Sequence, residues 1–179
     1  MDAETFREGI FALNTRRFGT VAEVVIKRLV GASQARSLFH DLYDDAKNRR
    51  IEVKFSRALK KAATPISEST VLRCIQEATS EQRMLTLEQS KTEEFDCNIQ
   101  QVKRVEFEVL YYGVFFADCL EIFRIQSADI GPRIFYSDKQ HKGNVGEGQF
   151  HINQDTIQIH LDSYAYKSLT YDELIDLLR

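Results

Sequence analysis

The spacing of apolar residues changes from a helical period to a two-residue alternation within the first sixty residues, which requires a fold containing both helices and strands. Apolar residues recur at helical spacing over residues 5–13 and again over residues 20–30, where Gly31 follows as a C-cap. Residues 37–44 and 49–56 then alternate polar and apolar side chains and are joined by a polar turn. This order predicts two helices followed by a β-hairpin.

Two further helices are predicted from spacing and capping signals. The first covers residues 67–78. Its inner face would be formed by Val71, Leu72, Ile75 and Ala78. Thr170 and Glu173 form a capping box for a last helix that ends near Leu178.

Strands are expected in the second half of the chain, where β-branched and aromatic residues are dense. The predicted strands are residues 102–116, 120–125, 149–152 and 156–161. Because helices flank this block of strands, the sequence predicts an α/β fold with a mixed β-sheet flanked by helices.

The size and composition of the chain fit a single domain over residues 1–179. No apolar run approaches the roughly 20 residues that a membrane span needs, so no membrane partner is expected. The three cysteines are widely spaced without a CxxC pair, which favours a reduced, cytoplasmic setting. Neither GxGxxG nor GxxxxGK occurs, so no nucleotide cofactor is expected.

Basic side chains cluster locally, although the net charge of −3 does not make the whole chain an obvious ligand for polyanions. Residues 47–61 contain seven lysines and arginines and a single acid, Glu52. Such a segment attracts phosphate, and an ordinary solvated surface has the same composition. Arg57, Lys60 and Lys61 are therefore candidate DNA-contacting residues.

Two acids and a lysine lie where a hairpin would bring them together. Alternation places Glu52 and Lys54 on one face of the second hairpin strand, and pairing across the hairpin brings Asp41 beside them. Two carboxylates suit a hard divalent cation such as Mg²⁺, which activates a bound water and stabilises a phosphate under attack. Lys54 would hold that water. Each residue alone also fits a plain surface or turn role, and Asp44 or Asp45 would replace Asp41 if the register differed.

The order Asp41, ten intervening residues, Glu52, an apolar residue and Lys54 resembles the PD-(D/E)XK nuclease superfamily, with His40 in place of the usual proline. The upstream Gly-Thr-Val-Ala-Glu segment, residues 19–23, is similar to the helix of Holliday-junction resolvases and related members. The glutamate of that helix assists at the metal site in those proteins. The resemblance covers about residues 19–57, under a quarter of the chain.

This resemblance implies a restriction-endonuclease-like core over about residues 19–126. It implies that Asp41 and Glu52 bind Mg²⁺, with Mn²⁺ as a substitute. Lys54 would position the attacking water, and Glu23 would be an auxiliary acid.

A DNA-recognition region is expected at about residues 132–162, because residues 136–153 are rich in side chains that contact phosphates or base edges. An ordinary surface loop remains the alternative. The candidate DNA-binding residues are Lys139, Gln140, His141, Lys142, Asn144 and Gln149.

Within the superfamily, a small free-standing domain with an added polar loop looks most like a type II restriction endonuclease. The resemblance then implies a homodimer that cleaves double-stranded DNA at a short specific sequence. One alternative is a structure-specific repair or junction-resolving nuclease, which Glu23 favours. The other is a non-catalytic nucleic-acid-binding module, in which Glu52 and Lys54 form only a surface ion pair.

Overall fold

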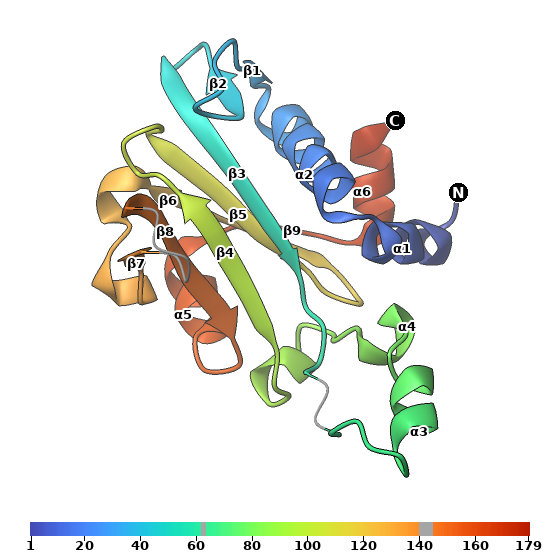
Figure 1. The fold of residues 1–179 in the computed structure, drawn as a ribbon. Helices are drawn as coiled ribbons and strands as arrows, with labels where there is room; N and C mark the ends of the chain where they lie inside the picture. The colour runs from blue at the N-terminus through green and yellow to red at the C-terminus, as the bar shows by residue number, and fades with distance from the viewer. Residues whose placement is uncertain (62–63, 140–144) are drawn as a thin grey trace.

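The computed structural model describes residues 1–61, 64–139 and 145–179, which form two β-sheets with helices packed around them (Figure 1). The strands are β1 (Ser33–Gln34), β2 (Leu42–Asp44), β3 (Arg49–Arg57), β4 (Asp96–Val102), β5 (Val109–Phe115), β6 (Leu120–Gln126), β7 (Ser137–Lys139), β8 (Val145–Asn153) and β9 (Ala165–Leu169). The helices are α1 (Ala3–Ala12), α2 (Thr15–Val30), α3 (Val71–Gln76), α4 (Ser80–Arg83), α5 (Ile157–Tyr164) and α6 (Tyr171–Leu178). Short 3₁₀ turns are η1 (Gln89–Lys91), η2 (Ser127–Asp129) and η3 (Pro132–Ile134).

Among the described residues, the larger sheet has six strands in the order β1-β2-β3-β5-β6-β9 and the smaller has three in the order β4-β8-β7. β3 and β5 pair in parallel, whereas the other pairs of the large sheet are antiparallel. The large sheet is therefore mixed. The predicted α/β class, with a mixed sheet flanked by helices, is confirmed at this level.

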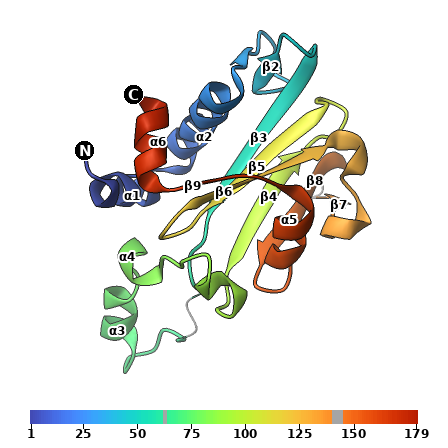
Figure 2. The same cartoon turned by 180° about the vertical axis from the view of Figure 1, so that it is seen from behind.

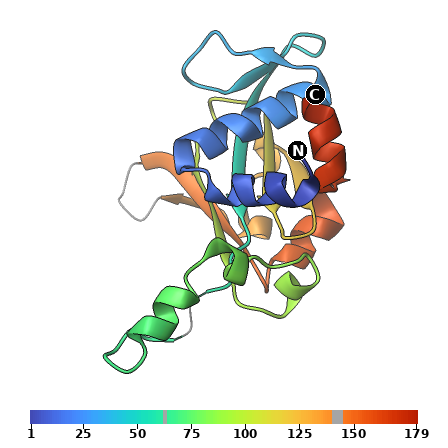
Figure 3. The ribbon, with the colours of Figure 1, turned by 90° about the vertical axis from the view of Figure 1, so that its right-hand side faces the viewer.

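Helices α1, α2 and α6 cover one face of the large sheet (Figure 3). The apolar stripe of α2, including Phe18 and Val25, is buried against Ile51 and Val53 of β3. This packing follows from the helical spacing of apolar residues, because one stripe of α2 must leave water. α2 thus lies over the strand that carries the predicted catalytic residues.

The other face of the large sheet packs against the smaller sheet and α5 (Figure 2). Tyr112 of β5 and Phe123 of β6 stack here with ring centroids 5.1 Å apart, and Phe150 of β8 meets Tyr112 edge-on. Buried aromatic rings supply large apolar areas to a core. The smaller sheet therefore has one buried face and one face turned to solvent.

The predicted helices near both ends of the chain are confirmed. α2 begins at Thr15, earlier than the predicted residue 20, because the Asn14 side chain accepts a hydrogen bond from the Arg17 N–H. Gly31 ends α2 at φ 68°, in the left-handed region that favours glycine. The capping box of Thr170 is present at α6. In the described ranges, no helix has the length and apolar character that crossing a membrane requires.

The prediction for residues 67–78 is wrong in its extent and its packing. α3 covers only Val71–Gln76, and the side chains of its supposed inner face are exposed: 75% for Leu72 and 63% for Ile75. α3 projects from the body of the molecule, so within the described residues no sheet lies against that face (Figure 3). Helical spacing alone does not ensure burial.

Several strand predictions also need correction. Residues 157–161 lie in α5 and Thr156 is its N-cap, because the Asn153 side chain accepts the Thr156 N–H in the turn that precedes the helix. The predicted strand 102–116 is reduced to β5, since its first residue ends β4 and a turn follows. β4 and β9 were not predicted, whereas β6 matches residues 120–125 closely.

Gly113 lies at a close approach between strands in the large sheet. A Cβ at this position would lie 2.9 Å from the backbone oxygen of Glu121 and 3.0 Å from Cζ of Phe55. Both contacts are tighter than normal packing allows, and the Glu121 oxygen belongs to backbone that cannot easily move. The site thus excludes any larger residue.

We expect Gly113→Ala to lower the free energy of unfolding by about 1–3 kcal/mol, because the added methyl overpacks the core. Gly9→Ala in α1 is the matched control, since nothing lies within 4 Å of its added Cβ. Alanine there should stabilise the protein by up to about 1 kcal/mol. Urea denaturation of both variants measures these changes, and equal stabilities would contradict the close approach.

His160 of α5 is fully buried, and its ring packs against Tyr112 and Phe123 of the large sheet. Its Nδ1 lies 2.9 Å from the Tyr112 hydroxyl, and within the described residues its Nε2 has no hydrogen-bond partner. Burial lowers the pKa of His160 to about 4, because the imidazolium cannot be hydrated there. The native protein therefore holds this histidine neutral at pH values where an unfolded chain would protonate it.

This burial predicts that acid weakens the fold. Between pH 6.5 and about 4 the unfolded chain binds a proton that native His160 does not, so stability falls as the pH falls through that window. From pH 7 to pH 4.5 the loss from this residue is about 2–3 kcal/mol. His160→Gln should remove that part of the pH dependence. Urea denaturation at both pH values measures it, and identical pH slopes for the two proteins would contradict the prediction.

Candidate metal-dependent active site

β3 carries the central pair of the candidate site, Glu52 and Lys54. In the parallel register these residues lie opposite Leu110 and Tyr112 of β5. Residues two apart on a strand share a face, and Val53, which lies between Glu52 and Lys54, is buried on the helical side. The strand therefore holds the Glu52 carboxylate and the Lys54 ammonium side by side on the face away from α2.

Asp41 lies immediately before β2 and is bound to the uncovered edge of β3. Its backbone N–H donates to the Ile51 carbonyl at 3.1 Å, and its Oδ2 accepts a hydrogen bond from the Val53 N–H at 2.8 Å. The carboxylate thus takes the place that a strand carbonyl would occupy. This pairing determines the position of Asp41 beside Glu52 and Lys54.

Asp44 and Asp45, the two alternatives to Asp41, lie away from Glu52 and Lys54. Asp44 Oδ1 accepts the Lys47 N–H at 3.1 Å, and its Oδ2 lies 3.5 Å from the Arg49 guanidinium. Asp45 is an exposed residue of the turn. In this register Asp41 is the first acid of the site, and Asp44 stabilises the turn.

Lys54 joins the two carboxylates. Its Nζ lies 2.5 Å from Glu52 Oε1 and 3.9 Å from Asp41 Oδ2. Burial alone would lower the pKa of Lys54, but the neighbouring charges of Glu52, Asp41 and Glu23 outweigh it and raise the pKa above its usual value. Lys54 is therefore a fixed ammonium at neutral pH.

Glu52 is the most buried member of the group, with 8% of its surface exposed. Burial raises its pKa to about 7, Lys54 opposes this shift, and the negative charge of Asp41 adds to it. A carboxylate that is destabilised in this way gains from a nearby cation. The burial of Glu52 also disfavours the interpretation of Glu52–Lys54 as a surface ion pair.

Glu23 of α2 belongs to the same electrostatic environment. Its pKa is raised first by burial and then by Asp41, whereas Lys54 lowers it. The packing of α2 over β3 thus places a third acid within range of the group. The similarity of residues 19–23 to the resolvase helix suggested such an acid.

The donor set fits a magnesium ion that keeps most of its waters. Within the described residues no cluster of three or more histidine, cysteine or acidic side chains is close enough to enclose a metal. Mg²⁺ in phosphate chemistry commonly uses only one or two protein carboxylates together with substrate oxygens. In the described chain Asp41 Oδ1 accepts no hydrogen bond, and Glu52 carries the destabilised charge. Asp41 and Glu52 therefore suit the ion.

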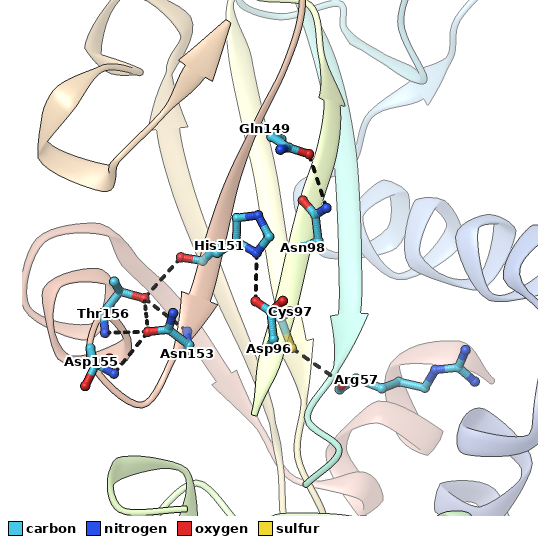
Figure 4. Close-up of polar contacts among 9 residues, drawn as sticks. All are labelled: Arg57, Asp96, Cys97, Asn98, Gln149, His151, Asn153, Asp155 and Thr156. Carbon is cyan, nitrogen blue, oxygen red and sulfur yellow. Dashed lines mark hydrogen bonds and ion pairs between the residues drawn. The ribbon is translucent and has the colours of Figure 1, made fainter. Parts of the chain in front are cut away.

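Arg57, a predicted DNA-contacting residue, has its guanidinium engaged within the fold. Its guanidinium donates to the carbonyls of Phe11 at 2.7 Å and Leu13 at 2.9 Å, where α1 ends. It also lies 4.5 Å above the ring of Phe18. The side chain points away from β4 toward the helices (Figure 4). Its charge is thus used to satisfy carbonyls that the helix leaves unpaired.

The other predicted DNA-contacting residues are dispersed. Lys60 forms an ion pair with Glu93 at 2.5 Å, and Lys61 and Lys139 are exposed. Gln149 lies on β8 and accepts a hydrogen bond from the Asn98 side chain. The remaining candidates, Gln140, His141, Lys142 and Asn144, lie outside the described residues.

The sequence analysis predicted Gln149 and the recognition region around it, but it missed the polar residues of β4 that lie beside them. Asp96 and Asn98 of β4 lie beside Gln149 and His151 of β8 (Figure 4). The available signal was the alternation of residues 96–100, in which Cys97 and Ile99 are buried and the intervening polar residues are exposed. Its short length and its amides, which are uncommon in strands, concealed it.

Comparisons with protein-family models, with curated proteins and with solved structures find no match to this chain.

Proposed function

We propose that this protein is a magnesium-dependent endonuclease that cleaves double-stranded DNA at a short specific sequence, in the manner of type II restriction endonucleases. One observation carries the proposal: the Lys54 ammonium contacts both the buried Glu52 carboxylate and the Asp41 carboxylate at the open edge of β3. An acid pair with a lysine is the chemistry that hydrolysis of a phosphodiester requires.

Each residue has a distinct role in this mechanism. Asp41 and Glu52 would hold Mg²⁺, which when bound supplies Lewis acidity to the phosphate and lowers the pKa of a coordinated water. Lys54 donates a hydrogen bond to the attacking water and, being cationic, stabilises its deprotonated form. The water gives a proton to solvent as its oxygen bonds to phosphorus, and the bond from phosphorus to the sugar oxygen on the opposite side breaks, so that this oxygen takes up a proton from solvent. Glu23 adds negative charge that favours the divalent ion.

The site is open enough for a DNA backbone. The side chains of Asp41 and Lys54 are 25% and 24% exposed, although that of Glu52 is 10% exposed. A phosphate could thus approach the outer atoms of the group while Glu52 remains shielded. Partial shielding strengthens the electrostatic contacts on which the mechanism depends.

A junction-resolving or repair nuclease is the second candidate, and the position of Glu23 favours it. The acid lies on α2 in electrostatic contact with Asp41 and Lys54, as the resemblance of residues 19–23 implies for resolvases. Both candidates use the same catalytic group. Digestion of a plasmid and of a branched DNA separates the two candidates, since only a sequence-specific endonuclease gives discrete plasmid fragments.

Loss of the ammonium should abolish cleavage while the fold persists. We expect Lys54→Ala to reduce the rate of plasmid cleavage in Mg²⁺ by at least about a hundredfold, because the water and the transition-state charge lose their donor. Glu52→Gln should have a comparable effect, because it removes a metal ligand.

Lys47→Ala is the matched control, since Lys47 lies on the same hairpin and is 66% exposed. This control should cleave like the wild type, and circular dichroism checks that every variant is folded. Full activity of Lys54→Ala would contradict the assignment.

Metal affinity should increase with pH. Because the pKa of Glu52 is raised to about 7, a proton competes with the metal below that pH. For one competing proton, Mn²⁺ binding should strengthen about tenfold from pH 6 to pH 8. Calorimetry in two buffers of different ionisation enthalpy should detect proton release at pH 6.

Glu52→Gln, which cannot titrate, should bind Mn²⁺ weakly and with little pH dependence. A pH-independent affinity of the wild-type protein, without proton release, would show that Glu52 is not a ligand.

A further inference from the structure

The solvent-facing side of the smaller sheet is made of amides and an imidazole. In β4 and β8, Cys97, Ile99, Phe150 and Ile152 are buried in the core, which anchors both strands. The opposite side carries Asn98, Gln100, Gln149 and His151, which we call the amide face. Rigid strands beneath a polar surface hold its side chains in place better than a loop would.

Hydrogen bonds orient three members of the amide face. Asn98 Nδ2 donates to Gln149 Oε1 at 3.2 Å, and His151 Nδ1 lies 2.7 Å from Asp96 Oδ1 (Figure 4). Within the described residues, the other polar atom of each of these three side chains has no hydrogen-bond partner. These atoms are Asn98 Oδ1, Gln149 Nε2 and His151 Nε2. The surface therefore presents an acceptor and a donor in adjacent, fixed positions.

Asn153 shows how a polar residue of the same strand behaves when it serves the fold. Its Oδ1 accepts the N–H groups of Asp155 and Thr156 at 3.0 and 3.1 Å in the turn that leads into α5 (Figure 4). Thr156 in turn donates its hydroxyl hydrogen to the His151 carbonyl. These groups are satisfied locally, in contrast to the outward atoms of the amide face.

A bulge adds one more amide at the end of β4. The pairing moves from Gln100–Gln149 to Val102–Gly148, which leaves Gln101 as an extra residue at φ 60°. Residues other than glycine rarely adopt a positive φ. Gln101 is exposed, so the distortion extends the row of glutamines along the strand.

The smaller sheet, whose outer side is the amide face, packs beside the strand of the candidate active site. β4 lies along β3, and the Cys97 thiol donates to the Arg57 carbonyl at the end of that strand. The connection from β4 to β5 carries Glu106, whose charge acts on Glu52. Both contacts join β4 or its connection to β5 with β3, the strand of the candidate active site.

We propose that the amide face reads base edges in the major groove of duplex DNA, with Asn98, Gln149 and His151 as specificity-determining residues. The inference rests on the proposed function for its ligand. The major groove admits β-strands, and an amide acceptor beside an amide donor, here Asn98 Oδ1 and Gln149 Nε2, matches the N6 donor and the N7 acceptor of adenine. None of the four residues that define the amide face is a lysine or an arginine, and Asp96 lies beside them, so these four residues suit base edges better than phosphates.

The test is selection from a random-sequence duplex pool with the Lys54→Ala protein, which should bind without cutting. Sequencing of the bound fraction identifies the preferred site. The same selection is made with Asn98→Ala and Gln149→Ala added together, and with Gln158→Ala as the matched control. Gln158 is an exposed glutamine of α5 that contacts Asp162.

We expect the Gln158→Ala protein to select the same sequence as its parent. The Asn98→Ala/Gln149→Ala protein should lose preference at one or two neighbouring base pairs, roughly tenfold or more at each. Its affinity for unrelated duplex should change less than about threefold, because base contacts contribute little to nonspecific binding. Thermal unfolding checks that the variant is folded.

The possible failures are distinguishable. If all proteins select the same sequence with equal strength, or none selects a sequence, the inference is overturned, and a protein partner becomes the better occupant of the face. If the wild type cuts DNA without sequence preference, the inference also fails while nuclease activity stands. If the wild type does not cut but the selected sequence is lost in the double variant, the proposed nuclease function fails. The inference that the amide face recognises base edges then stands.

Discussion

The parallel pairing of β3 with β5 is the constraint on which the rest of the structure depends, because it gives β3 two unlike faces and one open edge. Ile51 and Val53 are buried under the helices, so Glu52 must face the other way. β2 pairs with β3 only as far as Ile51, and beyond it the Asp41 carboxylate accepts the Val53 N–H. The same backbone arrangement thus completes the sheet and assembles the charged group.

This charged group is poorly explained as a device for stability. A buried carboxylate such as Glu52 loses hydration, and a paired lysine only partly compensates for that loss. Apolar residues of similar volume often serve a fold equally well. The accumulation of Glu23, Asp41 and Glu52 around one ammonium therefore favours a function in which a cation and a phosphate join the group.

Local signals predicted much of the secondary structure because they act over a few residues. The capping groups of α2 and α6 and the hairpin turn belong to this class. The predictions failed where packing decided the outcome. Leu72 has helical spacing but faces solvent on a projecting segment, and residues 156–161 alternate like a strand but follow the turn at Asn153 into α5.

The sequence by itself determined the neighbourhood of Asp41, Glu52 and Lys54, because a tight hairpin and a two-residue alternation leave few alternatives over so short a distance. Only the tertiary structure decided the rest. Asn98 meets Gln149, 51 residues away, and Arg57 reaches the end of α1 rather than solvent. The physical reason is that such contacts depend on how separate strands and helices pack, and no local pattern of side chains encodes that packing.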